Sequence, residues 1–162
     1  MNINTCKSLL LNKQAETWLA AVKQKPKLRF YILFKDKLKA EKYIQSSLSS
    51  YERSVLAQIR FGILKLHIET GRFNNTKLED RLCQICEKNE VEDEIHFLFH
   101  CKVYAVERMS WFENIRKDCP HFYYFEPEDQ LKYIFNEIPR CTARFIIACL
   151  NIRNDKLYTP AL

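Results

Sequence analysis

Three cysteines and one histidine in the middle of the chain have the residue types and the spacing of metal ligands. Cys83, Cys86, His96 and Cys101 follow the pattern Cys-x2-Cys-x9-His-x4-Cys. A Cys-x2-Cys turn lets two sulfur atoms reach one cation, and the later histidine and cysteine can complete a tetrahedron from a neighbouring segment. Because four protein ligands leave no position for a catalytic water, we expect one structural Zn²⁺ ion that holds the fold together.

Two other interpretations of these residues are open at the level of sequence. The chain contains seven cysteines, and because free cysteines are often buried, the three could simply belong to a hydrophobic core. His100 is a competing ligand, because it would share a helical face with residue 96. We prefer His96, since His100 and Cys101 would crowd two adjacent ligands onto one ion.

The ligands lie within a longer pattern of aromatic, basic and acidic residues. It comprises Phe30-Tyr31, Phe34-Lys35, Tyr43, Arg60, Leu66-His67, Ile68-Glu69-Thr70-Gly71-Arg72-Phe73, Arg81-Leu82-Cys83-Gln84-Ile85-Cys86, Val91-Glu92-Asp93-Glu94-Ile95-His96-Phe97-Leu98, Cys101, Tyr104 and Arg108. This pattern covers about half of the 162 residues and resembles the zinc-binding region near the C-terminal end of reverse transcriptases from non-LTR retrotransposons. The resemblance implies zinc at the four ligands, a role in binding nucleic acid for the polymerase, and no catalysis in this region.

The sequence lacks the motifs of several catalytic sites. A reverse transcriptase palm needs paired aspartates for two metal ions, and no Asp-Asp pair occurs. With only two glycines, Gly62 and Gly71, no glycine-rich phosphate loop can form. His-Glu-x-x-His and Gly-x-Ser-x-Gly motifs are also missing. We therefore expect a chain that is not an enzyme.

Length and composition favour one globular domain inside a cell. The 162 residues are 47% hydrophobic and 13% aromatic, which is enough for a sizeable core. No apolar run of about 18 residues and no signal sequence occurs, so we expect neither membrane insertion nor secretion. An odd number of cysteines without a signal peptide predicts reduced thiols, and hence a cytoplasmic or nuclear location.

Hydrophobic periodicity predicts a mainly α-helical fold around the ligands. The expected helices are 14–24, 50–69, 103–117, 127–138 and 140–153. A capping box of Ser49 and Glu52 would open the second of these helices, and Gly71 would follow it as the left-handed C′ residue. Gly62 inside the same helix predicts a close contact or a kink. The helix at 103–117 is expected to bury Val106, Met109, Ile115 and one of Trp111 and Phe112.

Positive charge is concentrated in the first half of the chain. Residues 1–80 hold 15 Lys or Arg against 7 Asp or Glu, whereas residues 81–162 hold 11 against 13. Cations that meet phosphates beside aromatic rings that stack on bases are typical of RNA or DNA binding. The candidate nucleic-acid-binding residues, interleaved with Phe30, Tyr31 and Phe34, are Lys23, Lys25, Lys27, Arg29, Lys35, Lys37, Lys39 and Lys42. A solvated surface with its aromatic rings turned inward would give the same pattern.

The metal-binding loop is acidic. Between the first and last ligand, one basic residue, Lys88, faces five acidic residues, Glu87, Glu90, Glu92, Asp93 and Glu94. With three thiolates and Zn²⁺ the loop would carry a charge of about −5. We therefore expect it to repel phosphate, and the ion to hold the acidic half of the chain against the helices that carry the basic residues.

Together these patterns predict a small, mainly α-helical domain organised around one Cys3His zinc site. Its predicted segments are an N-terminal helix with its flank (1–26), a basic helical region (27–80), the zinc module with the following helix (81–118) and C-terminal helices (119–162). The favoured function is non-catalytic binding of RNA or DNA, with other domains of a reverse transcriptase as further candidate partners. The alternative is a structural or protein-interaction module that binds another chain through the aromatic residues near Phe122 or the helix around Trp111.

Overall fold

The structure is a computed structural model that describes residues 2–35 and 37–158. The outer ends of the first and last predicted segments, residue 1 and residues 159–162, lie outside this range. Over the described residues, regular structure is helical, and the one β pairing is an isolated antiparallel bridge between Leu82 and Val91. The predicted mainly α-helical fold class is therefore confirmed. No helix of the described chain is both long and apolar enough to cross a membrane.

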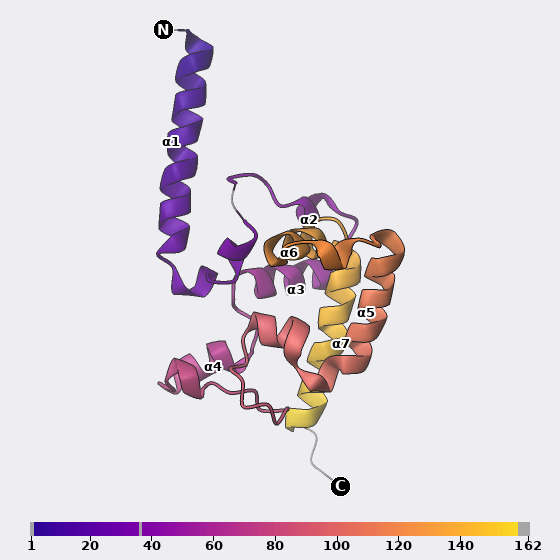
Figure 1. Cartoon of the computed structure of the whole chain (residues 1–162). Coiled ribbons are helices and arrows are strands. Elements are labelled where there is room, and N and C mark those ends of the chain that lie inside the picture. The colour runs from indigo at the N-terminus through magenta and orange to yellow at the C-terminus, as the bar shows by residue number, and fades with distance from the viewer. Residues whose placement is uncertain (1, 36, 159–162) are drawn as a thin grey trace.

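The α-helices are α1 (Ile3–Lys23), α2 (Lys42–Gln45), α3 (Ser50–Arg60), α4 (His67–Phe73), α5 (Ala105–Asp118), α6 (Pro127–Asn136) and α7 (Pro139–Tyr158) (Figure 1). The 3₁₀ turns are η1 (Pro26–Leu28), η2 (Tyr31–Leu33), η3 (Leu78–Asp80), η5 (Lys102–Tyr104) and η6 (Phe122–Tyr124). One further turn, η4 (His96–His100), is a π-helix. Helices α5, α6 and α7 lie close to their predicted positions, and Pro139 is the first residue of α7.

Helix α7 is the centre of the core. Helices α3, α5 and α6 all pack against it, and in Figure 1 α3 crosses it while α5 runs alongside. The Trp111 ring of α5 stacks on the Phe145 ring of α7 with 4.2 Å between their centroids. Because only one stripe of α5 faces α7, Trp111 and Ile115 are buried as predicted. The expectation that Val106 and Met109 are buried is wrong, since they are 76% and 65% exposed.

Helix α3 begins as predicted but ends earlier. The capping box of Ser49 and Glu52 is present. The helix then stops at Arg60, and Gly62 has a φ of +63°. A Cβ atom on Gly62 would lie 2.5 Å from the carbonyl oxygen of Lys27. The close contact predicted at Gly62 is therefore present. The prediction that Gly71 is the left-handed C′ residue is wrong, because the left-handed residue is Gly62 and Gly71 lies inside a separate helix, α4.

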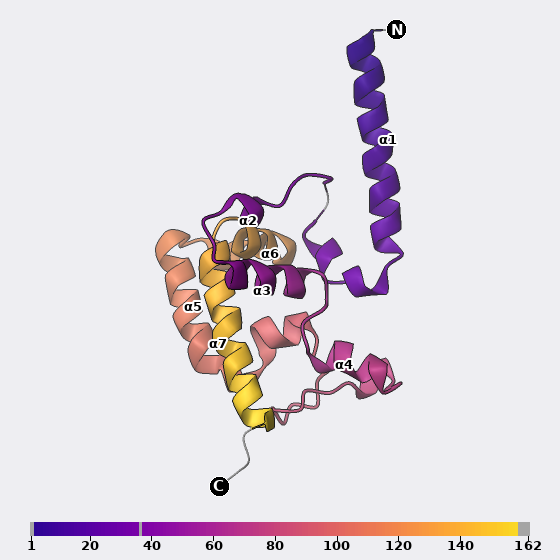
Figure 2. The ribbon, with the colours of Figure 1, turned by 180° about the vertical axis from the view of Figure 1, so that it is seen from behind.

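Helix α1 is longer than the predicted 14–24. It starts at Ile3 behind the N-cap Asn2 and ends, as predicted, before Pro26. Its C-terminal half contacts the core through Trp18 and Val22. Its N-terminal half stands away from the rest of the molecule in both views (Figures 1 and 2).

Candidate metal centre

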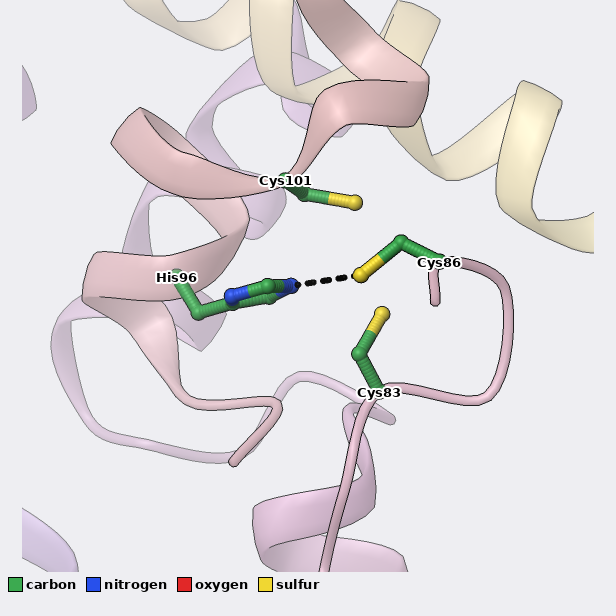
Figure 3. A group of neighbouring side chains, drawn as sticks. All are labelled: Cys83, Cys86, His96 and Cys101. Carbon is green, nitrogen blue, oxygen red and sulfur yellow. Dashed lines mark hydrogen bonds between the residues drawn. The ribbon is translucent and has the colours of Figure 1, made fainter. Parts of the chain in front are cut away.

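Four side chains from two segments converge on one point. Figure 3 shows the sulfur atoms of Cys83, Cys86 and Cys101 and the imidazole of His96 turned toward one another. Their ligand atoms all lie within 4.8 Å of one another, and all four residues are buried. They are the one group of three or more such residues found in the described part of the chain. This geometry can hold one metal ion, as the spacing predicted.

A short hairpin presents the first two ligands. It is closed by the Leu82–Val91 bridge and by a 2.9 Å bond from the Cys83 amide to the carbonyl oxygen of Glu90. Asn89 turns the chain with a φ of +54°.

The π-helical turn η4 presents the other two ligands. The Cys101 amide donates to the carbonyl oxygen of His96 at 2.8 Å, an i+5 bond that brings these two residues to the same side of the turn. The Asp93 carboxylate caps the turn by accepting from the His96 amide at 2.7 Å. His96 belongs to the cluster, whereas His100 is exposed and lies outside it, which agrees with the preference for His96 as the ligand.

A carboxylate orients the histidine ligand. Nε2 of His96 lies 3.4 Å from the Cys86 sulfur, inside the cluster, while Nδ1 lies 2.7 Å from Oε2 of Glu90. A protonated Nδ1 that donates to Glu90 leaves the lone pair of Nε2 for the metal. In the sequence, Glu90 is only one of five acidic residues of the loop and carries no signal of this contact.

The pKa values of the four grouped side chains depend on one another. The Cys101 sulfur, together with burial, raises the pKa of Cys83 to about 12, and Cys83 in turn lowers the pKa of Cys101. Burial alone would lower the pKa of His96, but Cys83 and Glu90 outweigh it and raise the value to about 9. Because protons and a cation compete for the same ligand atoms, metal binding at Cys83 and His96 would release protons.

Glu92 ties the hairpin to the C-terminal helix. It is buried, and its two oxygens accept from Nε and Nη2 of Arg153 in α7 at 2.7 and 2.8 Å. The same carboxylate accepts from the His67 amide at 2.6 Å. One buried charge thus connects the hairpin, α7 and the first residue of α4.

Helix α4 is attached to the hairpin by further bonds. The Ile68 amide donates to the carbonyl oxygen of Glu92 at 3.1 Å, and Nδ1 of His67 lies 2.7 Å from the carbonyl oxygen of Leu82. Arg81, two residues before the first ligand, donates from Nη1 to the carbonyl oxygen of Ile68 at 2.8 Å. A metal that fixes the hairpin therefore also fixes α4.

The acidic loop is less negative than its sequence implies. Three of its five carboxylates pair with cations, Glu92 with Arg153, Glu94 with Arg29 and Glu87 with Lys102. Glu90 and Asp93 instead bond to His96, through its ring and its backbone amide. Arg153 comes from α7 and Arg29 from the basic region, so both bring positive charge to the loop from outside it. The negative potential that a phosphate would meet at the loop is therefore weaker than the number of its acidic residues suggests.

The eight predicted nucleic-acid-binding residues fall into two groups. Four form ion pairs within the molecule: Lys27 with Glu69, Arg29 with Glu94, Lys35 with Glu41 and Lys42 with Glu137. The other four, Lys23, Lys25, Lys37 and Lys39, are exposed and have no ion-pair partner in the described part of the chain. The interleaved rings of Phe30, Tyr31 and Phe34 are buried. Of the two interpretations of this segment, the one with inward-facing rings is correct for the aromatic residues.

Those rings surround a buried cation. Arg60 pairs with Glu41, and its guanidinium carbon lies 4.7 Å from the centroid of the Phe34 ring and 5.2 Å from that of Tyr43. Burial lowers the pKa of Arg60, while the carboxylate and the aromatic faces offset the loss of water. These residues of the family-like pattern thus hold the core of the first half together.

No protein-family model matches the chain, and no curated protein or solved structure matches it significantly. What the centre can do chemically therefore rests on its own donor atoms and their surroundings.

Proposed function

We propose that the ion held by the four ligands is Zn²⁺ and that its role is structural. Three thiolates and one imidazole form the soft, tetrahedral ligand set that zinc prefers in closed sites. All four ligands are buried, which supports a site without room for a substrate or a reactive water. The ion would join the hairpin to η4, and through Glu92 it would join both to α4 and α7.

We further propose that the chain binds RNA or DNA without catalysis, like the zinc-binding region of non-LTR retrotransposon reverse transcriptases that it resembles. The observation that carries this proposal is the placement of unpaired charge. In the metal loop, Glu92 pairs with Arg153 and Glu90 contacts His96, so these carboxylates have partners within the chain. Lys23 and Lys25, beside η1, are exposed and have no ion-pair partner among the described residues. A phosphate backbone would meet a positive surface there.

Metal content tests the first proposal. Elemental analysis of natively purified protein is expected to give one zinc per chain. Cys83→Ser, Cys101→Ser and His96→Ala should each lose the metal, because each removes a ligand. His100→Ala and Cys141→Ser, which lie outside the cluster, should retain it. A metal-free protein with the full helical circular dichroism of the native chain would refute the structural role.

Salt dependence tests the second proposal. Binding to a labelled oligothymidylate, followed by fluorescence anisotropy, should weaken as salt rises, with a log–log slope of about −0.7 for each phosphate contacted. Lys23→Gln with Lys25→Gln should weaken binding to any sequence and flatten that slope. Arg116→Gln with Lys117→Gln removes the same charge from α5 and should change neither quantity. The proposal is wrong if the parent protein does not bind, or if the control pair weakens binding equally.

One observation favours a second candidate, a protein-interaction module. Val106 of α5 is exposed and lines a groove of about 950 Å³ between α5, α7 and the loop before α3. Binding of an apolar partner in this groove would depend little on salt concentration, whereas binding of nucleic acid would weaken steeply as salt rises. The same titration therefore separates the two candidates.

A further inference from the structure

The last residue of α4 places an aromatic ring in solvent. Phe73 is 78% exposed at the tip of the helix. The residues that follow it, Asn74, Asn75, Thr76 and Lys77, are all polar. The next apolar residue, Leu78, is also exposed. At 78% exposure the Phe73 ring is open to a planar ligand, which an aromatic face can stack against.

Two cations meet at the Glu69 carboxylate, one helical turn before Phe73. Arg72 precedes Phe73, and its Nη1 lies 3.1 Å from Oε2 of Glu69, while Nζ of Lys27 in η1 lies 2.6 Å from Oε1 of the same carboxylate. Burial alone would raise the pKa of Glu69, but the two cations hold it below its ordinary value, so the carboxylate stays charged. One negative charge faces two half-exposed cations, and the group keeps a net positive charge beside Phe73.

The backbone beneath the ring is fixed before any ligand arrives. The Thr76 amide donates to the carbonyl oxygen of Gly71 at 2.9 Å, and Asn75 makes the turn with a φ of +53°. Arg81 donates from Nε and Nη2 to the carbonyl oxygen of Thr76 at 3.0 and 2.8 Å. The Arg81 side chain also packs closely against Gly71, because its Cγ atom would lie 2.8 Å from a Cβ atom added there. A rigid support of this kind lowers the entropy cost of binding.

We propose that the tip of α4 is a stacking site for an unpaired base of single-stranded RNA or DNA. Phe73 covers one face of the base, and Arg72 and Lys27, which share the Glu69 carboxylate and leave the group with a net positive charge, bind a neighbouring phosphate. Stacked bases in a duplex have both faces covered, so the site selects single strands. The inference rests on the proposed binding of RNA or DNA, and it adds the form of the nucleic acid and the residue that contacts the base.

The test compares Phe73 variants on single-stranded and duplex probes of equal length. For oligothymidylate or oligouridylate, Phe73→Ala should lower affinity about 5- to 150-fold, the range that stacking on one base supports, with no change in the salt slope. Phe73→Leu should lose as much, because leucine is apolar but cannot stack, whereas Phe73→Trp should bind like the parent. Affinity for the duplex should be the same for all four proteins.

Tyr124 provides a matched control, because it is 86% exposed but lies beside acidic residues. Tyr124→Ala should leave binding unchanged, and Arg72→Gln should weaken binding to any sequence and flatten the salt slope by about 0.7. The side chain of Phe73 is exposed, so its variants should melt like the parent.

If Phe73→Ala binds normally while the Lys23 and Lys25 variant is weakened, the stacking site is wrong and the proposed function stands. If Phe73→Leu binds like the parent, the contact is apolar and the stacking site is again wrong.

Discussion

Glu90 and His96 form a pair that the spacing of ligands does not reveal. The Cys-x2-Cys-x9-His-x4-Cys pattern predicted all four ligands, because a turn and a nearby segment suffice to bring them together. Glu90 has no such signal, since its contact with Nδ1 of His96 depends on the hairpin turn at Asn89. Glu92 is harder still to predict, because its partner Arg153 is 61 residues away in sequence.

The first prediction concerns Glu90. Glu90→Gln keeps the size of the side chain but removes the charge that orients and polarises the imidazole, so zinc affinity should fall about 10- to 100-fold. Competition with a chromophoric chelator measures this affinity. Glu87→Gln is the control, because Glu87 pairs with Lys102 at the surface and touches no ligand, and it should leave zinc affinity unchanged. Equal zinc affinity for Glu90→Gln and the parent would contradict the role of Glu90.

The second prediction concerns the buried pair of Glu92 and Arg153. Arg153→Met leaves the Glu92 carboxylate buried without its cation, so the free energy of unfolding in urea should fall by about 3–5 kcal/mol. Lys102→Met breaks an exposed ion pair of similar length and should have no measurable effect. A small loss for Arg153→Met would mean that water reaches Glu92 and that the hairpin is not tied to α7 by this charge.

At the scale of elements, a local signal predicted the start of α3 but not its end, whereas for α1 Pro26 predicted the end and the start was missed. Ser49 with Glu52 marks the start of α3 through bonds within one turn. The end of α3 at Arg60 depends on η1, since the Lys27 carbonyl occupies the space beside Gly62. Nothing in the periodicity of residues 50–69 records that contact. The exposure of Val106 could not be predicted for the same reason, because the hydrophobic pattern of α5 does not indicate which of its apolar side chains another helix covers.

The third prediction distinguishes the two glycines. Gly62→Ala forces a left-handed φ on alanine and places its Cβ against a backbone oxygen, so it should cost at least about 1–3 kcal/mol of unfolding free energy. Gly71→Ala should cost less, because Gly71 lies inside α4 outside the left-handed region, and the atom nearest to the added Cβ belongs to the Arg81 side chain and not to the backbone. Thermal melts of the two variants should therefore rank Gly62→Ala as the less stable. The reverse order would move the strained position to α4.

At the scale of the whole molecule, the metal centre and the proposed stacking site on α4 are separate, but the same hairpin contributes to both. The net positive charge of residues 1–80 predicted a partner for the first half of the chain. Pairing within the fold then reduces the exposed, unpaired members of the predicted set to Lys23, Lys25, Lys37 and Lys39. The hairpin that carries Cys83 and Cys86 also holds α4, so an ion bound at the four ligands would fix the tip of α4 without contacting it.

The last prediction follows from this shared support. Removing zinc with a chelator should free the hairpin and with it the tip of α4, so affinity for single-stranded oligothymidylate should fall although no ligand side chain contacts the strand. In the Phe73→Ala background the same treatment should change affinity much less, because the stacking contact is already absent, and the two losses should not add. Helical circular dichroism followed in parallel separates release of the tip from unfolding of the domain. Equal losses on chelation in the parent and in Phe73→Ala would show that the ion does not act through α4.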